Sequence, residues 1–187
     1  RSPLSAIQSL LRVLVDGYGG KLEEQTMNMI QRAEYRVLAL IETVSDLLRV
    51  AEFDFQPRRG DGEVVNVADT ARGILLEIRE KADVSGVELV DQLPQDLPVL
   101  ADSGDITNTL HNLIENAVKY TPEGGTVTVS GASIDKHISI SVADTGIGIP
   151  LDSQADLFNE FYRAANAKAR QSTGTGLGLV IAKRSAE

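Results

Sequence analysis

A heptad repeat near the N-terminus sets the strongest limit on how this chain can fold. Apolar residues recur there at alternating spacings of three and four over three repeats: Ile30, Ala33, Val37, Leu40, Val44, Leu47 and Ala51. This spacing puts them on one stripe of a long helix. Ile41 and Leu48 widen the stripe, and so wide a stripe favours a four-helix bundle over a two-stranded coil.

A shorter helix is predicted before this one. The same spacing relates Leu4, Ile7, Leu11 and Leu14. A glycine-rich stretch at 17–20 then interrupts the pattern, so that the two helices form a hairpin. One hairpin supplies only half of a four-helix bundle. We therefore expect residues 1–55 to form a homodimer through the hairpin; the alternative is a hairpin that packs on the rest of its own chain.

The pattern of apolar and polar residues changes after the hairpin. Residues 56–62 are polar and contain proline and glycine, which predicts a linker. Over residues 63–187 we expect extended segments at 64–67, 87–93 and 98–101, helices at 68–83 and 103–120, alternating strands around Val127 and Ile140, and a helix from about Gly176. Residues 146–175 show little pattern. The fold class predicted is α+β: a helical hairpin followed by an α/β sandwich with one sheet covered by helices.

Charge and composition narrow the classes of function. The net charge is -9, from 18 Lys and Arg against 27 Asp and Glu, which argues against nucleic-acid binding through phosphate contacts. The chain has no cysteine, so disulfides and thiolate chemistry are excluded. Its two histidines, His111 and His137, form no metal-ligand cluster and are expected to be structural. No apolar run approaches the roughly 20 residues that cross a bilayer.

The predicted helix at 103–120 has an unusual polar face. Asn108, Asn112, Asn116 and Lys119 share one side of it, and the apolar residues share another. Amide oxygens are suitable ligands for a hard cation, and a lysine can neutralise phosphate. The alternative is an ordinary solvated face.

Two glycine-containing segments follow. Asp144 comes directly after a predicted strand, where its carboxylate can accept from an exocyclic amine. Gly146 and Gly148 behind it allow the backbone to approach a ligand closely; the alternative is a simple turn. The second segment opens a helix and contains Gly174, Thr175, Gly176, Leu177 and Gly178. A helix N-terminus with exposed N–H groups suits phosphate, although the spacing is neither a P-loop nor a Rossmann fingerprint.

Taken together and in this order, the segments resemble the ATP-binding (Bergerat-fold) domain of the sensor histidine kinases of two-component systems. Residues 112–122 are similar to the family's N box, 144–148 to its G1 box, 157–163 to its F box and 174–179 to its G2 box. Residues 1–4 are similar to the end of the H box, which contains the phosphorylated histidine. The resemblance covers essentially the whole chain and extends more widely to gyrase, the ninety-kilodalton heat-shock chaperones and MutL-type ATPases.

The resemblance implies a role for each site residue. Asp144 would bind the adenine amino group, and Tyr120 would pack beside the base or ribose. Asn116 would coordinate Mg²⁺, with phosphate or metal contacts also from Asn112, Lys119 and Arg163. The remaining cofactor contacts would come from Gly146, Gly148, Gly174, Thr175, Gly176, Leu177 and Gly178. Residues 149–173 would form a lid that closes over ATP.

The function implied is ATP-dependent phosphorylation of a hairpin histidine, followed by transfer to an aspartate of a response regulator docked near residues 1–35. The gyrase and chaperone branches carry a glutamate that acts on water where Asn112 stands. Asparagine cannot act as that base, which favours phosphoryl transfer over hydrolysis. A non-catalytic scaffold and an ATPase of the same superfamily are the alternatives.

Three features depart from the family pattern. The phosphorylated histidine would lie three residues before Arg1, so the chain as given would bind ATP without phosphorylating itself. The family domain continues into further strands beyond Glu187. Ser2 stands where many relatives have Thr or Asn, which leaves phosphatase activity open. A cytoplasmic location is expected, with any membrane anchor upstream of Arg1.

Overall fold

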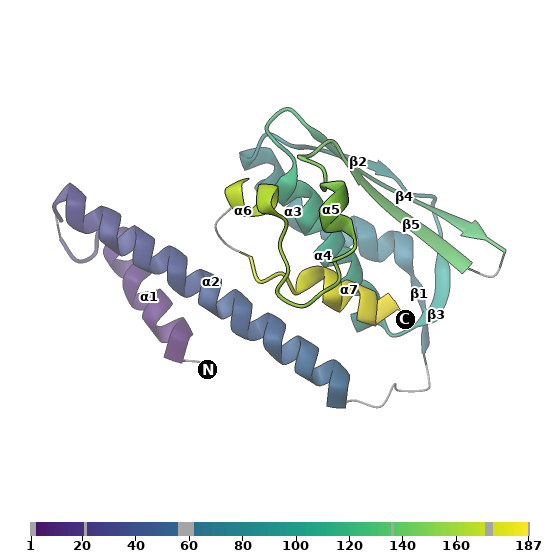
Figure 1. Cartoon of the computed structure of the whole chain (residues 1–187), viewed down its shortest axis with the longest axis horizontal. Coiled ribbons are helices and arrows are strands. Elements are labelled where there is room, and N and C mark those ends of the chain that lie inside the picture. Colours follow the sequence, from purple (N-terminus) through teal and green to yellow (C-terminus); the bar gives the residue numbers. More distant parts are fainter. Residues whose placement is uncertain (1–2, 21, 56–61, 136, 171–173, 187) are drawn as a thin grey trace.

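The computed structural model describes residues 3–20, 22–55, 62–135, 137–170 and 174–186. The predictions for Arg1, Ser2 and most of the linker lie outside these residues. Two antiparallel helices run along one side of a body of strands and helices (Figure 1). The predicted division into domains at 1–55, 56–62 and 63–187 stays a prediction.

The hairpin consists of α1 (Pro3–Val15) and α2 (Glu24–Phe55), which pack against each other. Gly17 and Gly20 between them have φ of 85° and 88°, a left-handed conformation that glycine adopts without a steric penalty. The heptad stripe of α2 is only partly covered by α1. Leu40, Val44 and Leu47 remain 48%, 39% and 47% exposed, respectively. A single chain therefore leaves an apolar stripe uncovered along α2.

Within the described residues, the body contains five strands. They are β1 (Glu63–Asn66), β2 (Glu88–Gln92), β3 (Pro98–Ala101), β4 (Thr126–Ile134) and β5 (His137–Asp144). Strand β4 pairs with β2 in parallel and with β5 in antiparallel orientation, giving a three-stranded sheet. Strands β1 and β3 pair with each other in a separate antiparallel sheet. The mixed α+β fold is confirmed.

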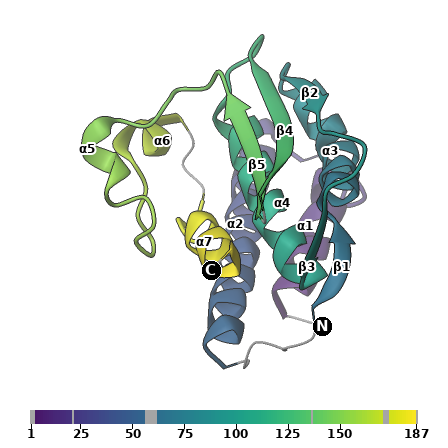
Figure 2. The ribbon, with the colours of Figure 1, turned by 90° about the vertical axis from the view of Figure 1, so that its right-hand side faces the viewer.

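The helices of the body are α3 (Val67–Val84), α4 (Ser103–Tyr120), α5 (Leu151–Gln154), α6 (Ala165–Arg170) and α7 (Gly178–Ala186). Helices α3 and α4 contribute Ile74, Ile78 and Ile114 to the core beneath the three-stranded sheet, where they meet Val127 and Val129. The predicted face shared by the two valines is confirmed, since neither side chain is exposed to solvent. Helix α7 packs along α4 and beside α2 (Figure 2).

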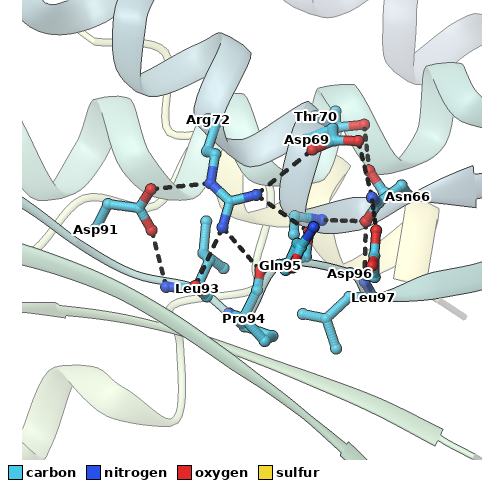
Figure 3. A network of polar contacts seen from close by, with 11 residues as sticks. Asn66, Asp69, Thr70, Arg72, Asp91, Leu93, Pro94, Gln95, Asp96 and Leu97 are labelled. Carbon is cyan, nitrogen blue, oxygen red and sulfur yellow. Dashed lines mark hydrogen bonds and ion pairs between the residues drawn. The ribbon is translucent and has the colours of Figure 1, made fainter.

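The expectation of one sheet is wrong, and the connection between β2 and β3 gives the physical reason. Residues 93–95 follow the end of β2 and are held against α3 by Arg72 (Figure 3). Its guanidinium donates to the carboxylates of Asp69 and Asp91 and to the carbonyl oxygens of residues 93, 94 and 95. Strand β3 consequently leaves the larger sheet and pairs with β1.

Replacing Arg72 with methionine is expected to lower the free energy of unfolding by about 1–3 kcal/mol, because the loop loses its charge-assisted hydrogen bonds. Urea unfolding followed by circular dichroism measures this. Arg79→Met is the matched control: it removes an exposed arginine from the same helix and should cost less than about 0.5 kcal/mol. Equal losses in both variants would contradict the role given to Arg72.

Within the described residues, no helix is both long and apolar enough to span a bilayer.

Candidate functional site

A cavity of about 740 Å³ lies between α4, the end of β5, the segment from α5 to α6, and the start of α7. Eleven of the predicted site residues line it: Asn112, Asn116, Lys119, Tyr120, Asp144, Gly148, Arg163, Gly174, Thr175, Gly176 and Gly178. Two do not. Gly146 supports the turn behind Asp144, and Leu177 is buried beneath α7, where it is 1% exposed.

Helix α4 brings its polar face to this cavity because its apolar face is fixed in the core. Asp102 caps the start of the helix: its side chain accepts from the backbone N–H groups of residues 104 and 105. Leu110 and Ile114 are buried on the far side. Asn112 and Asn116 therefore face the cavity one turn apart, and Asn112 Nδ2 donates to the carbonyl oxygen of Asn108 at 2.9 Å. Asn108 itself is not among the lining residues.

One end of the cavity is formed by the turn after β5. Asp144 Oδ1 accepts from the Gly146 N–H at 2.8 Å, and the Ile147 N–H donates to the carbonyl oxygen of Tyr120 at 3.2 Å. A Cβ on Gly146 would lie 2.5 Å from Asp144 Oδ1 and 2.8 Å from the Tyr120 carbonyl oxygen. Only glycine permits this close approach. The turn thus presents one carboxylate beside the C-terminal end of α4.

At the other end, the start of α7 meets the polar face of α4. A Cβ on Gly178 would lie 3.0 Å from Asn112 Oδ1 and 3.6 Å from Asn116 Nδ2. A Cβ on Gly174 would lie 3.1 Å from Lys119 Nζ and 3.5 Å from the guanidinium of Arg163. Two cationic side chains, two amides and the positive end of a helix dipole converge here, an arrangement that favours a polyanion.

The segment between the two ends contains the aromatic residues of the predicted lid. Lys183 Nζ lies 5.4 Å from the centroid of the Phe158 ring, and Arg184 forms an ion pair with Glu160 at 2.9 Å. Tyr162 and Arg163 line the cavity. The sequence pattern did not predict the two short helices within this segment, α5 and α6.

Several lining residues were not among the predicted site residues, although those between 149 and 167 lie within the predicted lid. They are Ser45 of α2, His111, Leu113, Glu115, Ala117, Val142, Ile147, Ile149, Gln154, Leu157, Tyr162, Ala164, Asn166, Ala167 and Leu179. The one-turn spacing of His111 and Glu115, beside the asparagine pair, was the available signal for those two. Asn166 carried no such signal, because its placement depends on the path of the lid. His137, at the start of β5, is not a lining residue.

Glu115 belongs to a charged cluster at the edge of the cavity. Burial raises the pKa of its carboxyl, but the hydrogen bond from Lys81 and nearby positive charge outweigh this and hold the pKa below its usual value. His111 lies 3.7 Å from the carboxylates of both Glu77 and Glu115. Among the described residues, no group of three or more His, Cys, Asp or Glu side chains could hold a metal ion.

Comparison with known proteins gives consistent matches. Residues 101–187 match the family described as histidine kinase-, DNA gyrase B- and HSP90-like ATPase. The chain is 34% identical to the sensor histidine kinase WalK of Bacillus subtilis, over 98% of this chain and 30% of WalK. It is 30% identical to the adaptive-response sensory kinase SasA of Trichormus variabilis, over 96% of this chain and 47% of SasA. The chain thus spans less than half of these relatives.

Two solved structures resemble the fold. The mycobacterial sensor histidine kinase MprB is 31% identical with a TM-score of 0.60, over 66% of this chain and 78% of that chain. Full-length ShkA, crystallised in complex with AMPPNP, is 27% identical with a TM-score of 0.69, over 98% of this chain and 40% of that chain.

Proposed function

The chain belongs to the sensor histidine kinases, whose ATP-binding domain it contains, and we propose that its cavity binds Mg·ATP for phosphoryl transfer to a histidine. One observation supports this more than any other. Three segments far apart in the sequence, α4, the turn after β5 and the start of α7, line the same cavity with the polar groups that a nucleotide needs at its two ends.

The base would bind beside Asp144. One oxygen of its carboxylate accepts from the Gly146 N–H, so that the carboxylate is held in place for the exocyclic amine of adenine. Tyr120 lines the cavity at the same end, and its ring would pack beside the base or ribose. ShkA, a chain of similar structure, was crystallised with AMPPNP, which is an ATP analogue. This complex supports an adenine nucleotide as the ligand.

The phosphates would bind where Lys119 and Arg163 approach Gly174. Asn116 would hold Mg²⁺ through its amide oxygen, assisted by Asn112 one turn earlier. Mg²⁺ held there would neutralise charge that develops on the phosphates during transfer. The donor set fits that ion because amide oxygens and phosphate oxygens are both hard ligands. The backbone N–H groups at the start of α7 would complete the phosphate site.

Transfer to a protein acceptor is proposed rather than hydrolysis. Asn112 has no proton-accepting carboxylate with which to activate water. The acceptor would be a histidine on the hairpin, and the phosphoryl group would pass from it to an aspartate of a response regulator. The apolar stripe left exposed along α2 supports a homodimer in which two hairpins form a four-helix bundle.

The test is phosphohistidine formation by the protein expressed from its complete reading frame. Incubation with Mg²⁺ and ATP labelled in the γ-phosphate should give an acid-labile, base-stable label on the protein. Asn116→Ala should remove the label. Bound ATP without label would favour a scaffold that does not phosphorylate, and steady release of inorganic phosphate without label would favour an ATPase.

A further inference from the structure

Asn166, near the start of α6, contacts the turn that contains Asp144. It lines the cavity and is partly buried. Its Nδ2 donates to the carbonyl oxygen of Gly148 at 2.9 Å and lies 3.5 Å from that of Ile147. Its Oδ1 accepts from the Ala167 N–H at 2.9 Å. Both ends of the amide are engaged, so its orientation is fixed: the amide nitrogen faces the turn.

The turn is supported differently on its two sides. On the side of α4, the Ile147 N–H donates to the Tyr120 carbonyl oxygen at 3.2 Å. At Gly148, φ is +63° and an added Cβ would meet none of the described atoms within 4 Å. The space where a Gly148 side chain would stand is therefore empty among the described residues, and Asn166 contacts the carbonyl oxygen of the same residue. This contact joins the predicted lid to the turn.

A second contact fixes the other end of the same short helix. Arg170 donates to the carbonyl oxygen of Thr121 at 2.9 Å, and Thr121 ends α4 next to Tyr120. Helix α6 is thus attached to the Asp144 end of the cavity at two points. The earlier part of the lid, with Phe158 and Glu160, is attached instead to α7.

We propose that Asn166 is a positioning residue: by holding the carbonyl groups of residues 147 and 148, it fixes the Asp144 turn for a purine base and couples that turn to helix α6. The proposal rests on nucleotide binding in this cavity, as proposed above. Asn166 acts through the backbone at the base end, so its removal affects every ligand that contains the base. The number of phosphate groups on the ligand should therefore not change the loss of affinity that removing Asn166 causes.

The experiment is a calorimetric titration of the full chain with adenosine, ADP and Mg·ATP. Loss of one hydrogen bond in Asn166→Ala should raise all three dissociation constants by a similar factor, about three- to tenfold. Asn166→Asp keeps the size of the side chain but replaces the donor with a charged acceptor against two carbonyl groups, and should weaken all three at least as much. Circular dichroism verifies that each variant is folded.

Asn159→Ala is the matched control. Asn159 is an asparagine of the same lid whose Nδ2 donates to Asp156 Oδ1 at 2.9 Å, and it is not a lining residue. It should leave all three dissociation constants within twofold of the original. If Asn159→Ala raised the dissociation constants as much as Asn166→Ala does, Asn166 would only support the lid in general, and the proposal would be overturned.

Two other results would also overturn it: unchanged binding of all ligands by the folded Asn166 variants, or weaker binding of Mg·ATP with adenosine unaffected. Failure of the proposed function gives a different result. If the unaltered chain binds none of the three ligands, both the function and this inference are wrong. If the unaltered chain binds them and the variants do so equally well, only the inference is wrong.

Discussion

Asn116→Ala is expected to weaken binding of Mg·ATP by about 10- to 100-fold while leaving adenosine binding within twofold. The amide of Asn116 faces the cavity beside Gly178, at the end where Lys119 and Arg163 also converge. Removing it deletes the proposed oxygen ligand of Mg²⁺ without touching the turn at Asp144. Calorimetric titration with each ligand, with and without Mg²⁺, measures the effect. The stimulation of ATP binding by Mg²⁺ should disappear in the variant.

Asn108→Ala provides the control for this prediction. Asn108 lies on the same face of α4, two turns before Asn116, but outside the cavity lining. Removing its side chain should therefore leave the binding of Mg·ATP and of adenosine unchanged. Two results would contradict the assignment of the cation to Asn116. Asn116→Ala could bind Mg·ATP as tightly as the original chain, or its affinity for adenosine could fall by the same factor as its affinity for Mg·ATP.

Gly176→Ala should prevent the cavity from forming in its present shape. Gly176 has φ of +73°, and an added Cβ would lie 2.6 Å from the Tyr162 carbonyl oxygen and 2.8 Å from the Phe161 carbonyl carbon. These are backbone atoms, so the lid or the start of α7 must move. We expect loss of measurable Mg·ATP binding, together with a lower free energy of unfolding.

Gly124→Ala separates the steric clash from backbone strain. Gly124 has φ of +79°, but its added Cβ would meet none of the described atoms within 4 Å. The left-handed conformation alone should cost about 1–2 kcal/mol in unfolding free energy and leave ATP binding intact. Thermal unfolding and the same titrations measure both quantities. If Gly176→Ala bound ATP as well as Gly124→Ala does, the close contact between the lid and α7 would not be required.

The polar half of the site could be predicted because helical periodicity alone places Asn112 and Asn116 on one face. The buried residues Leu110 and Ile114 occupy the other face, so the direction of each asparagine follows from the sequence. Likewise, the alternation around Val127 and Val129 predicted a strand with one buried face, as observed. In these elements, local pattern and tertiary contacts agree.

Other features depend on contacts between distant segments, which local patterns do not encode. The separation of β1 and β3 into their own sheet follows from the loop held by Arg72, whose partners in β2 and the loop are 19 to 23 residues away along the chain. Helix α6 is six residues long, too short for a periodic pattern, and its place is set by Asn166 and Arg170. Asn166 therefore could not have been identified from its sequence context.

The cavity also involves the hairpin, which was predicted to be a separate domain. Ser45 of α2 is a lining residue, and α2 contacts α7. Leu179 of α7 lines the cavity as well. The cavity is thus bordered by α2, the helix that carries the proposed dimer interface, and the hairpin is in physical contact with the site.

Calorimetric titration of this chain with Mg·ATP tests the central claim most directly. The account predicts saturable binding of one ATP per chain, with adenosine competing for the same site because both contain the base that Asp144 recognises. A folded chain that releases no heat and shows no binding at millimolar Mg·ATP would contradict the account. Binding that adenosine does not displace would contradict the assignment of Asp144 to the base.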